Sequence, residues 1–404
     1  MLGVKLDDYC GKKIFNFGIR VVKKYIDRAR HLKRKISREI KYTLNPSLKY
    51  GGPSGLAKKW IDYQTYQQKG GTWIEVYSEQ KYPHKRARTH NWGKDKFNFS
   101  RNLKSTIPPT GVFKIPHGQV LHNQGYVLTQ DDYFMVDTSY HRQRLVHANL
   151  PKEKYPVEFL DGTCLSLMSN ASNNYYHFLL DAIPRLHLFE KAGFSLNDVD
   201  YILMNQPMSP NAWDIFEQMG IDESKCVWAQ KGKGIQAKML IATTHPSLDR
   251  HHPHWMVNFM QTRINLSPCK PHRLLYIPRK TGTRKIINDD QIYGILEKFG
   301  FEYYLPENDT NQPQTFHEAS IIVTPHGAAL GNLVFCQPHT KVLEFISTGH
   351  LREYFFSLAH VANLEHHYII GETIPPTKPR GKSSKNDYFI EPRYLQKALC
   401  FLMK

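Results

Sequence analysis

The sequence lacks closely spaced cysteines. Its six cysteines are spread along 404 residues, and the closest pair, Cys226 and Cys269, is 43 residues apart. This spacing excludes a compact disulfide framework and any CxxC element, and a reducing compartment fits it best. The sequence also lacks an uninterrupted apolar run as long as a signal peptide or a membrane-spanning helix. These absences predict a cytoplasmic protein that at most attaches to the inner face of a membrane.

Acidic residues are scarce relative to basic ones. The chain has 36 Asp and Glu against 54 Lys and Arg, which gives a formal net charge of +18. A field of this size attracts phosphate-bearing partners, which include nucleic acid, anionic lipid and sugar nucleotides, and charge alone does not choose among them. The 41% hydrophobic and 12% aromatic content is enough for a globular chain of one large or two ordinary domains.

The positive charge is concentrated near the N-terminus, in an expected helical segment over residues 1–43. Residues 12–41 contain twelve basic and two acidic residues, a net charge of +10. A basic amphipathic helix can lie on anionic lipid, or it can pack its apolar stripe on the body of the protein. No nucleic-acid-reading motif accompanies this charge. The apolar residues that recur at helical spacing are Ile14, Phe17, Val21, Tyr25, Leu32, Ile36 and Ile40.

The remaining chain divides by the texture of its sequence. Residues 44–110 are polar and rich in Gly and Pro pairs, which predicts an irregular linker or sheet edge. Residues 111–268 begin with short apolar strands and then alternate helix with strand, and the alternation continues through residues 269–375. Residues 376–404 are expected to form a linker and a C-terminal helix. This alternation predicts an α/β protein with parallel sheets, in two units divided near Pro268.

Individual elements of this alternation can be placed. The expected strands cover residues 201–204, 239–243, 274–277, 321–324 and 342–346. Two expected helices cover residues 175–192 and 290–299, and two more are expected to begin near residues 212 and 254.

The first block with chemical potential runs from Asn173 to Arg185. On a helix, His177, Asp181 and Arg185 are spaced i, i+4 and i+8, so a base, a carboxylate and a cation share one face. The same spacing fits a surface ladder of helix-stabilising pairs. Pro184 perturbs the turn between Asp181 and Arg185.

A second block follows the expected strand that ends at Ile277. The loop after it carries four cations, Arg279, Lys280, Arg284 and Lys285. A parallel sheet presents its ligand crevice at the carboxyl ends of its strands, and two bound phosphates need such donors. The block therefore predicts a diphosphate site, with an exposed basic loop as the alternative.

A third block spans residues 321–332, where a strand ends in a His326-Gly327 turn. Small residues start the next helix, so the backbone N–H groups at its N-terminus can approach an anion, unless they serve only close packing of the helix on its strand. Downstream, Glu344 is placed to bind ribose hydroxyls or to form a buried pair with an arginine.

These three blocks, in this order, resemble glycosyltransferase family 61, which includes capsule-biosynthesis proteins, over roughly residues 110 to 370. The family's N-Y-(Y/F)-H-W-L-L-D-x-(L/I)-P-R-L element is similar to residues 174–186, with Phe178 in place of Trp. Its Y-I-S-R-R element is similar to residues 276–284, with Pro278 in place of Ser. Its G-P-H-G-A-G-L-T-N element is similar to residues 324–332, where the departures are Thr324, Ala329 and Gly331.

The resemblance implies a GT-B architecture, in which two Rossmann-like domains face a cleft. It also implies inverting transfer of a sugar from a nucleotide-activated donor, with a UDP-sugar expected, and no cofactor or obligatory metal. The expected acceptor is a glycan or lipid-linked glycan in surface polysaccharide biosynthesis, such as a capsule, at a membrane surface. The alternative is a non-catalytic basic scaffold that binds anionic membrane or nucleic acid.

Residue roles follow from the matched positions. His177 is the expected base for the acceptor hydroxyl, oriented by Asp181, and the reverse assignment stays open. Arg185 completes the catalytic set, and Asn174 and Tyr176 are expected on the acceptor side. The expected donor-binding residues are Arg279, Lys280, Arg284, Thr324, Pro325, His326, Gly327, Ala328, Asn332 and Glu344.

Two patterns have the residue types of metal sites. Asp198-Val199-Asp200 precedes a strand, whereas the metal-binding DxD of transferases ends one, so it is expected to be a loop. In His251-His252-Pro253-His254, consecutive side chains diverge and Pro253 favours the start of a helix. No metal site is expected from either pattern.

Overall fold

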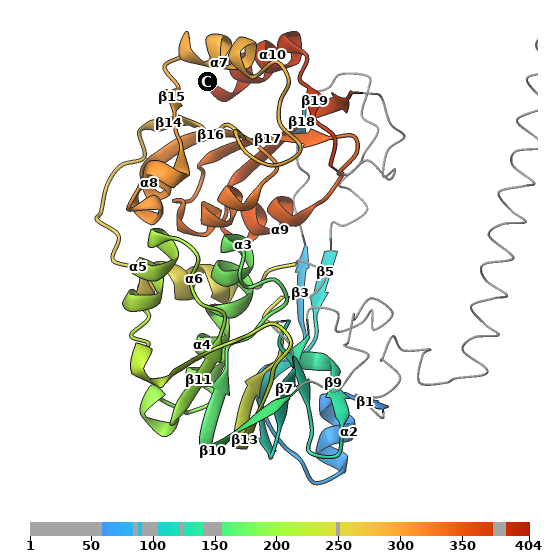
Figure 1. Ribbon diagram of the computed structural model, residues 1–404. Helices are drawn as coiled ribbons and strands as arrows, with labels where there is room; N and C mark the ends of the chain where they lie inside the picture. The colour runs from blue at the N-terminus through green and yellow to red at the C-terminus, as the bar shows by residue number, and fades with distance from the viewer. Residues whose placement is uncertain are drawn as a thin grey trace, which may run out of the picture.

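The computed structural model describes residues 59–83, 88–90, 104–121, 124–139, 156–247, 251–374 and 385–404. The basic helix expected over residues 12–41 lies outside these residues. The described elements gather around two sheets, which lie one above the other in Figure 1. Among the described helices, none combines the length and the apolar character that crossing a membrane requires.

The first sheet contains ten strands from the described residues. Its order is β1-β9-β8-β7-β13-β10-β11-β12, and β6 also pairs with β13 and carries β2 at its other side. β10 runs parallel to β11 and β13, whereas β6 and β7 run antiparallel to β13. The strands are β1 Lys59–Ile61, β2 Thr72–Tyr77, β6 Thr110–Pro116, β7 Gln119–Leu121, β8 Tyr126–Leu128, β9 Tyr133–Met135, β10 Val157–Ser166, β11 Tyr201–Met204, β12 Cys226–Trp228 and β13 Gly234–Thr243.

Both faces of this sheet are covered, which explains why its central strand is apolar at consecutive positions. Leu165 joins the core beneath the helices, and its neighbour Cys164 points to the other face, where it packs in one core with Phe113 and Tyr66. The helices and short turns of this half are α2 Tyr63–Gln68, η3 Val136–Thr138, α3 Tyr175–His177, the π-helix η5 Phe178–Ala182, α4 Pro184–Lys191, η6 Leu196–Asp198, α5 Pro210–Gln218, η7 Glu223–Lys225 and α6 His254–Arg263.

The second sheet contains seven strands from the described residues, in the order β15-β14-β16-β17-β18-β19, with β4 also paired to β18. All its pairs are parallel except β18 with β19. Its strands are β4 Arg88–Thr89, β14 Arg273–Tyr276, β15 Glu302–Tyr303, β16 Ala319–Pro325, β17 Lys341–Ser347, β18 Glu365–Thr373 and β19 Tyr388–Phe389. Its helices are α7 Asp289–Glu297, η8 Pro306–Asn308, α8 Gln312–Glu318, η9 Ala328–Phe335, α9 Tyr354–Val361 and α10 Pro392–Leu402.

The α/β class predicted from the alternating pattern is confirmed. The strand expected over residues 201–204 is β11, the one expected over 274–277 is β14 displaced by one residue, and those expected over 321–324 and 342–346 lie inside β16 and β17. These strands could be predicted because each is a short apolar run buried on both faces.

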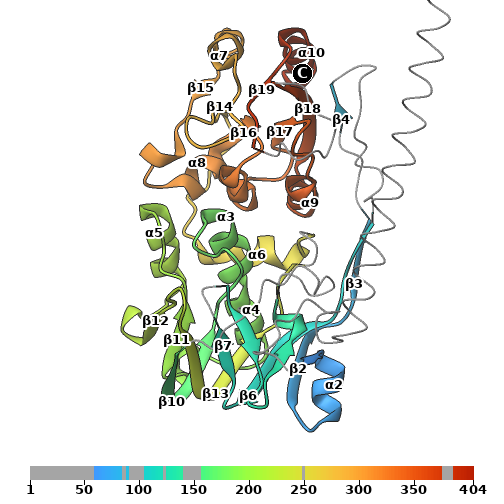
Figure 2. The same ribbon diagram turned by 45° about the vertical axis from the view of Figure 1, so that its right-hand side comes forward.

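The described part of residues 44–110 is not an irregular linker, but it includes strands at sheet edges, the other form that the sequence predicted. Residues 59–83 form β1, α2, β2 and β3 (Gln80–Pro83), and β2 pairs with β6 in the first sheet. β3 pairs with β5 (Lys104–Ile107) in a separate two-stranded ribbon, and β4 lies along β18 of the second sheet (Figures 1 and 2). Turn-forming pairs marked the ends of these elements, but their short length left no apolar period to read.

The helix expected over residues 175–192 is interrupted by a π turn. Pro184 has no N–H to donate within the helix, and the N–H of Ile183 bonds the carbonyl of Phe178, five residues back, at 3.0 Å. The wider turn rotates the residues after Pro184 relative to those before it. The face that sequence spacing assigned to His177, Asp181 and Arg185 is therefore not continuous.

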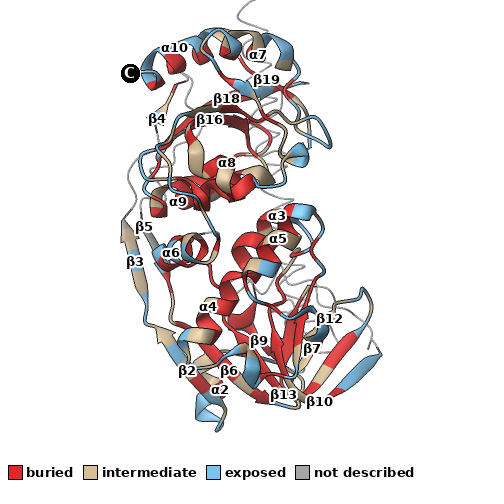
Figure 3. Ribbon diagram, turned by 90° about the vertical axis from the view of Figure 1, so that its left-hand side faces the viewer, coloured by how far each residue is buried: buried red, intermediate tan, exposed pale blue. Residues whose placement is uncertain are grey.

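The two halves share one apolar core where they meet. Leu179 of the π-helix and Leu330 of η9 belong to the same buried cluster, and the hydroxyl of Tyr175 donates to Asn332 Oδ1 at 2.6 Å. Figures 1 and 2 show α3, α5 and α6 of the first half facing α8 and α9 of the second. In Figure 3 the facing helices are buried over much of their length. The junction positions the blocks singled out by sequence next to each other.

Candidate functional site

His177 and Asp181 form a close pair at the junction. Asn174 caps the first turn of α3 by accepting the N–H of Tyr176 at 3.1 Å, and His177 ends that turn. His177 Nδ1 lies 2.6 Å from Asp181 Oδ2, and the side chain of His177 is 28% exposed whereas that of Asp181 is 1% exposed. The carboxylate therefore holds the ring from the protein side, and Nε2 is the nitrogen that could take a proton from a substrate.

Asp181 is ionised because its surroundings are polar. Burial opposes ionisation, but nearby His245, His177 and His252 together lower the pKa of Asp181 to about 2. Ser247 Oγ lies 3.4 Å from its Oδ1 and His245 Nε2 lies 3.9 Å from the same oxygen. Burial lowers the pKa of His245 to about 3, so this imidazole is neutral near pH 7. The network fixes the carboxylate that orients His177.

Arg185 faces the interior and not a substrate. Its guanidinium donates to three backbone carbonyls, those of Asp181, Thr243 and Thr138, at 3.0, 3.0 and 2.9 Å. Burial lowers the pKa of Arg185 to about 10 against the opposing effect of Asp181. Arg185 was expected to share a helix face with His177 and Asp181, and this expectation is wrong because the π turn redirects its side chain. Arg185 ties the helix to β13 and η3.

The two residues expected on the acceptor side make structural contacts. Tyr176 is buried, its hydroxyl lies 3.1 Å from His252 Nε2, and its ring meets the ring of Phe355 edge-on at 5.6 Å. Asn174 is exposed, and its side-chain oxygen is the cap of α3. These contacts set where His177 stands.

A cluster of arginines lies at the carboxyl end of the second sheet. Arg279, in the loop after β14, donates from Nη1 to the carbonyl of His326 at 3.1 Å. The Nε atoms of Arg279 and Arg284 are buried and have no hydrogen-bond partner among the described residues. A Cβ on Gly327 would lie 2.9 Å from Arg279 Nη1, so any larger residue here would displace the end of the Arg279 side chain.

The electrostatics of this cluster favour an anion. Burial lowers the pKa of both Arg279 and Arg284, and in Arg284 the neighbouring Arg279 and Arg352 lower it further. The opposing influence on Arg279 comes from Tyr388 and Asp387. Arg352 lies between β17 and α9 and was missed by sequence reasoning, although a basic turn after a buried parallel strand is the same signal that identified Arg279.

Lys280 does not join the cluster. Its Nζ pairs with Asp289 Oδ2 at 3.1 Å at the start of α7 and lies over the ring of Tyr303. Asp289 and Tyr303 raise the pKa of Lys280. Adjacent side chains in an irregular loop diverge, so Lys280 contacts α7 here, and its expected donor-binding role stays a prediction.

Glu344 holds two imidazoles. His326 Nδ1 lies 2.5 Å from its Oε1, and His366 Nε2 lies 2.9 Å from its Oε2. Burial opposes ionisation of Glu344, but the two histidines lower its pKa overall. Burial lowers the pKa of His326 overall, although the carboxylate of Glu344 acts to raise it. Both carboxylate oxygens bond imidazoles, so histidines and not an arginine are the described partners of Glu344, and its expected contact with a ribose stays a prediction.

Within the third block, only the His326-Gly327 turn lies against the arginines. Thr324 Oγ1 donates to the carbonyl of Ile277 at 3.1 Å, and Asn332 accepts from Tyr175 and donates to Gln312. Pro325 is buried at the end of β16, and Ala328 begins η9 with Gly327 as its N-cap. Thr324 and Asn332 therefore make packing contacts here, and their expected donor-binding roles stay predictions.

His326 lies against the ring of Phe355, which also contacts Tyr176, the residue before His177. The ring of Phe355 lies 5.6 Å from Tyr176, the neighbour of His177, and 4.8 Å from His326. Each histidine is held through Nδ1 by a buried carboxylate. Both imidazoles are oriented, and His326 belongs to the turn that contacts Arg279, which suits proton transfer next to a bound polyanion.

The two metal-like patterns form the expected loop and helix start. Asp198 accepts from the backbone N–H of Ser195, and Asp200 accepts from Thr163 at 2.8 Å. His254 begins α6, with Pro253 as its N-cap. In the part of the chain that the structure describes, no three His, Cys, Asp or Glu side chains are grouped so that they could hold a metal ion.

Comparison with known proteins matches the region that contains these residues. Residues 175–343 match the model of a family described as Glycosyltransferase 61. A 104-residue stretch is 32% identical to Beta-1,2-xylosyltransferase RCN11 of Oryza sativa subsp. japonica, and it covers 23% of this chain and 20% of that protein. The chain thus aligns with about a fifth of the length of this relative.

Proposed function

Because the chain belongs to glycosyltransferase family 61, we propose that it is an inverting enzyme that moves a sugar from a nucleotide-activated donor to a glycan or lipid-linked acceptor. The proposal adopts a GT-B arrangement in which the second half binds the donor and the first half supplies the base. It is supported by the parallel second sheet, whose strand ends carry the arginine cluster.

The observation that carries the proposal is a pair of half-buried arginines, each with a buried Nε atom. Arg279 and Arg284 keep Nε atoms without partners among the described residues, next to a glycine that gives the backbone close access. Burying such donors without acceptors is unfavourable, and a diphosphate supplies the missing acceptors and the opposite charge. The same groups would stabilise the charge that develops on a leaving nucleoside diphosphate.

The chemical step is an in-line displacement. The acceptor hydroxyl attacks the anomeric carbon, the bond from that carbon to the diphosphate oxygen breaks, and the anomeric configuration inverts. His177 Nε2 takes the hydroxyl proton while Asp181 holds Nδ1–H. His326, held in the same way by Glu344, is the second candidate for the base. The arginines provide the charge stabilisation that a metal ion gives in other transferases.

UDP-xylose is the first donor to test. The relative in rice is named as a xylosyltransferase, and a UDP-sugar is the expected donor class. The acceptor is proposed to belong to surface polysaccharide biosynthesis, with the protein in the cytoplasm and residues 12–41 attracting it to an anionic membrane through their net charge of +10. A non-catalytic scaffold is the competing function, and it requires no nucleotide binding.

Calorimetric titration of the full-length protein with UDP, GDP and CDP tests this function. We expect one diphosphate to bind, and Arg279→Ala to weaken it by about 1.5 to 3 kcal/mol, the value of a charge-assisted hydrogen bond. Lys280→Ala is the matched control, because the adjacent cation pairs with Asp289 instead, and it should bind normally. Equal affinity of the wild type and Arg279→Ala would place the phosphate site elsewhere, and no binding at all would favour the scaffold.

A further inference from the structure

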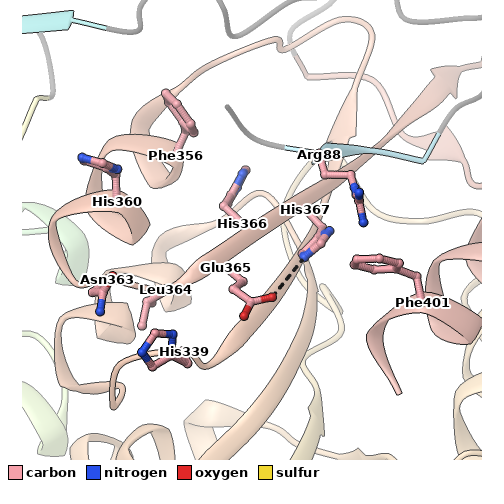
Figure 4. A pocket seen from close by; sticks show the side chains of 10 residues that line it. All are labelled: Arg88, His339, Phe356, His360, Asn363, Leu364, Glu365, His366, His367 and Phe401. Atoms are coloured by element: carbon pink, nitrogen blue, oxygen red, sulfur yellow. Dashed lines mark ion pairs between the residues drawn. The ribbon is translucent and has the colours of Figure 1, made fainter. Parts of the chain in front are cut away.

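A pocket of about 320 Å³ lies on the second half, away from the arginine cluster. The start of β18 forms its floor, α9 and the loop after it form one wall, and β4 with α10 forms the other (Figure 4). The arginine cluster, in contrast, follows the carboxyl ends of β14, β16 and β17. A ligand in this pocket would therefore occupy a site separate from the proposed donor.

The lining of this pocket is rich in nitrogen donors and aromatic rings. Four histidines, one arginine and one asparagine line it together with a single carboxylate, that of Glu365. The Cζ of Arg88 lies 4.0 Å from the centre of the Phe401 ring, which is 40% exposed, whereas the ring of Phe356 is almost fully buried in the wall. Rings that bear hydroxyls can lie on aromatic faces while imidazole and amide groups bond the hydroxyls.

The field in this pocket is positive. Burial lowers the pKa of His367 to about 3, and the nearby cations Arg88 and Lys341 contribute to the same shift. Glu365 offsets part of this charge from 4.0 Å, and its side chain is about half exposed. An acidic group beside Arg88 would be attracted by the charges of Arg88 and Lys341.

The pocket is connected to the candidate site through one carboxylate. His366 lines the pocket, and its Nε2 lies 2.9 Å from Glu344 Oε2. The other oxygen, Oε1, holds His326 Nδ1 at 2.5 Å. A change in the position or hydrogen bonding of His366 is therefore two contacts away from His326.

We propose that this pocket binds a small acidic sugar, one that carries a carboxylate or a phosphate, and that its occupancy alters His326 through His366 and Glu344. Arg88 receives the acidic group, and Asn363 and the imidazoles bond the hydroxyls. This inference goes beyond the proposed function, since it requires a second carbohydrate site whatever sugar is transferred.

Calorimetry of the full-length protein with glucuronate, glucose 1-phosphate and inorganic sulfate tests the site. We expect at least one of the two sugars to bind more tightly than sulfate, and Arg88→Gln to weaken it by at least about tenfold. Arg393→Gln is the matched control, because Arg393 also lies over a ring of α10, that of Tyr394, but does not line the pocket. Binding that is equal in Arg88→Gln and wild type, or no tighter than that of sulfate, would overturn the proposal.

Two further measurements separate this site from the donor site and test the connection. Arg279→Ala should leave the affinity for the acidic sugar unchanged, and saturating UDP should not displace it, whereas displacement by UDP would place the sugar at the arginine cluster. In protein with ¹⁵N-labelled histidine, saturation with the sugar should shift the ring signals of His326, assigned by their loss in His326→Gln. Signals of His326 that do not move would refute the connection.

Discussion

Replacing His177 by alanine is expected to abolish sugar transfer while leaving nucleotide binding and folding intact. The ring is 28% exposed, and Asp181 keeps Ser247 and His245 beside its other oxygen, so the fold should tolerate the loss of the ring. A positioned base contributes roughly a hundredfold to ten-thousandfold to rate. The nucleotide contacts are proposed to come from the arginine cluster and not from α3, so the affinity for UDP should not change.

The partner variant Asp181→Asn should retain intermediate activity. The pKa of Asp181 is about 2 in the fold against about 3.9 in an unfolded chain, so its ionised form is stabilised by roughly 2 to 3 kcal/mol. The amide keeps the shape but loses this charge. The loss of one charge-assisted hydrogen bond, about 1.5 to 3 kcal/mol, corresponds to a roughly 10- to 100-fold slower reaction. The residual rate would come from an imidazole that is less firmly oriented.

Release of the nucleoside diphosphate in the presence of acceptor, with UDP affinity and thermal unfolding measured in parallel, checks both variants. His272→Ala is the control for removal of a histidine, because His272 is exposed in the segment before β14, outside the site. A slower rate in Asp181→Asn than in His177→Ala would exchange the two roles. Normal transfer by both variants would refute the assignment and direct attention to His326.

Three further outcomes are expected. Gly327→Ala should weaken UDP binding by about tenfold and leave Tm unchanged, because the new Cβ would displace the flexible end of Arg279 and not the backbone. Calorimetry and a melting curve check this. Because the pKa of Glu344 is lowered in the fold, its charge stabilises the fold above its unfolded pKa of about 4.3, and this contribution is lost as the pH falls. The unfolding free energy of Glu344→Gln should therefore vary less between about pH 6 and 3 than that of the wild type. Denaturant titrations that give both proteins the same dependence of unfolding free energy on pH would contradict this. Deletion of residues 1–43 should release the protein from anionic vesicles at low salt, and a flotation assay in which the full-length protein also fails to bind would refute the membrane role.

The local parts of the site could be predicted from the sequence. The contact of His177 with Asp181 spans one helical turn, so their spacing was sufficient to bring them together. The loop with Arg279 followed a recognisable buried strand, so its place at the end of the sheet was also predictable. Both inferences use only neighbours in the chain and one rule of parallel sheets.

The parts that failed depend on distant residues. Glu344 bonds His326 and His366, which lie 18 and 22 positions away on other elements, and no local pattern selects those partners over an arginine. The position of Arg185 was predicted wrongly because the sequence indicates that Pro184 perturbs the helix but not in which direction the following residues turn. Lys280 and Arg279 are adjacent and chemically alike, and only the position of Asp289 separates their roles.

The crossing of β4 to the second sheet has a consequence for how the chain folds. His90 directly follows β4, and its Nε2 lies 3.1 Å from Nδ1 of His367, a residue 277 positions further along the chain. The second sheet therefore gains this strand only after nearly the whole polypeptide is available, and closing so long a loop is slow. If the chain were cut near Pro268, β4 and its partner β18 would lie on different fragments. We therefore expect the C-terminal half to fold fastest in a circular permutant in which residues 59–107 follow it along the chain.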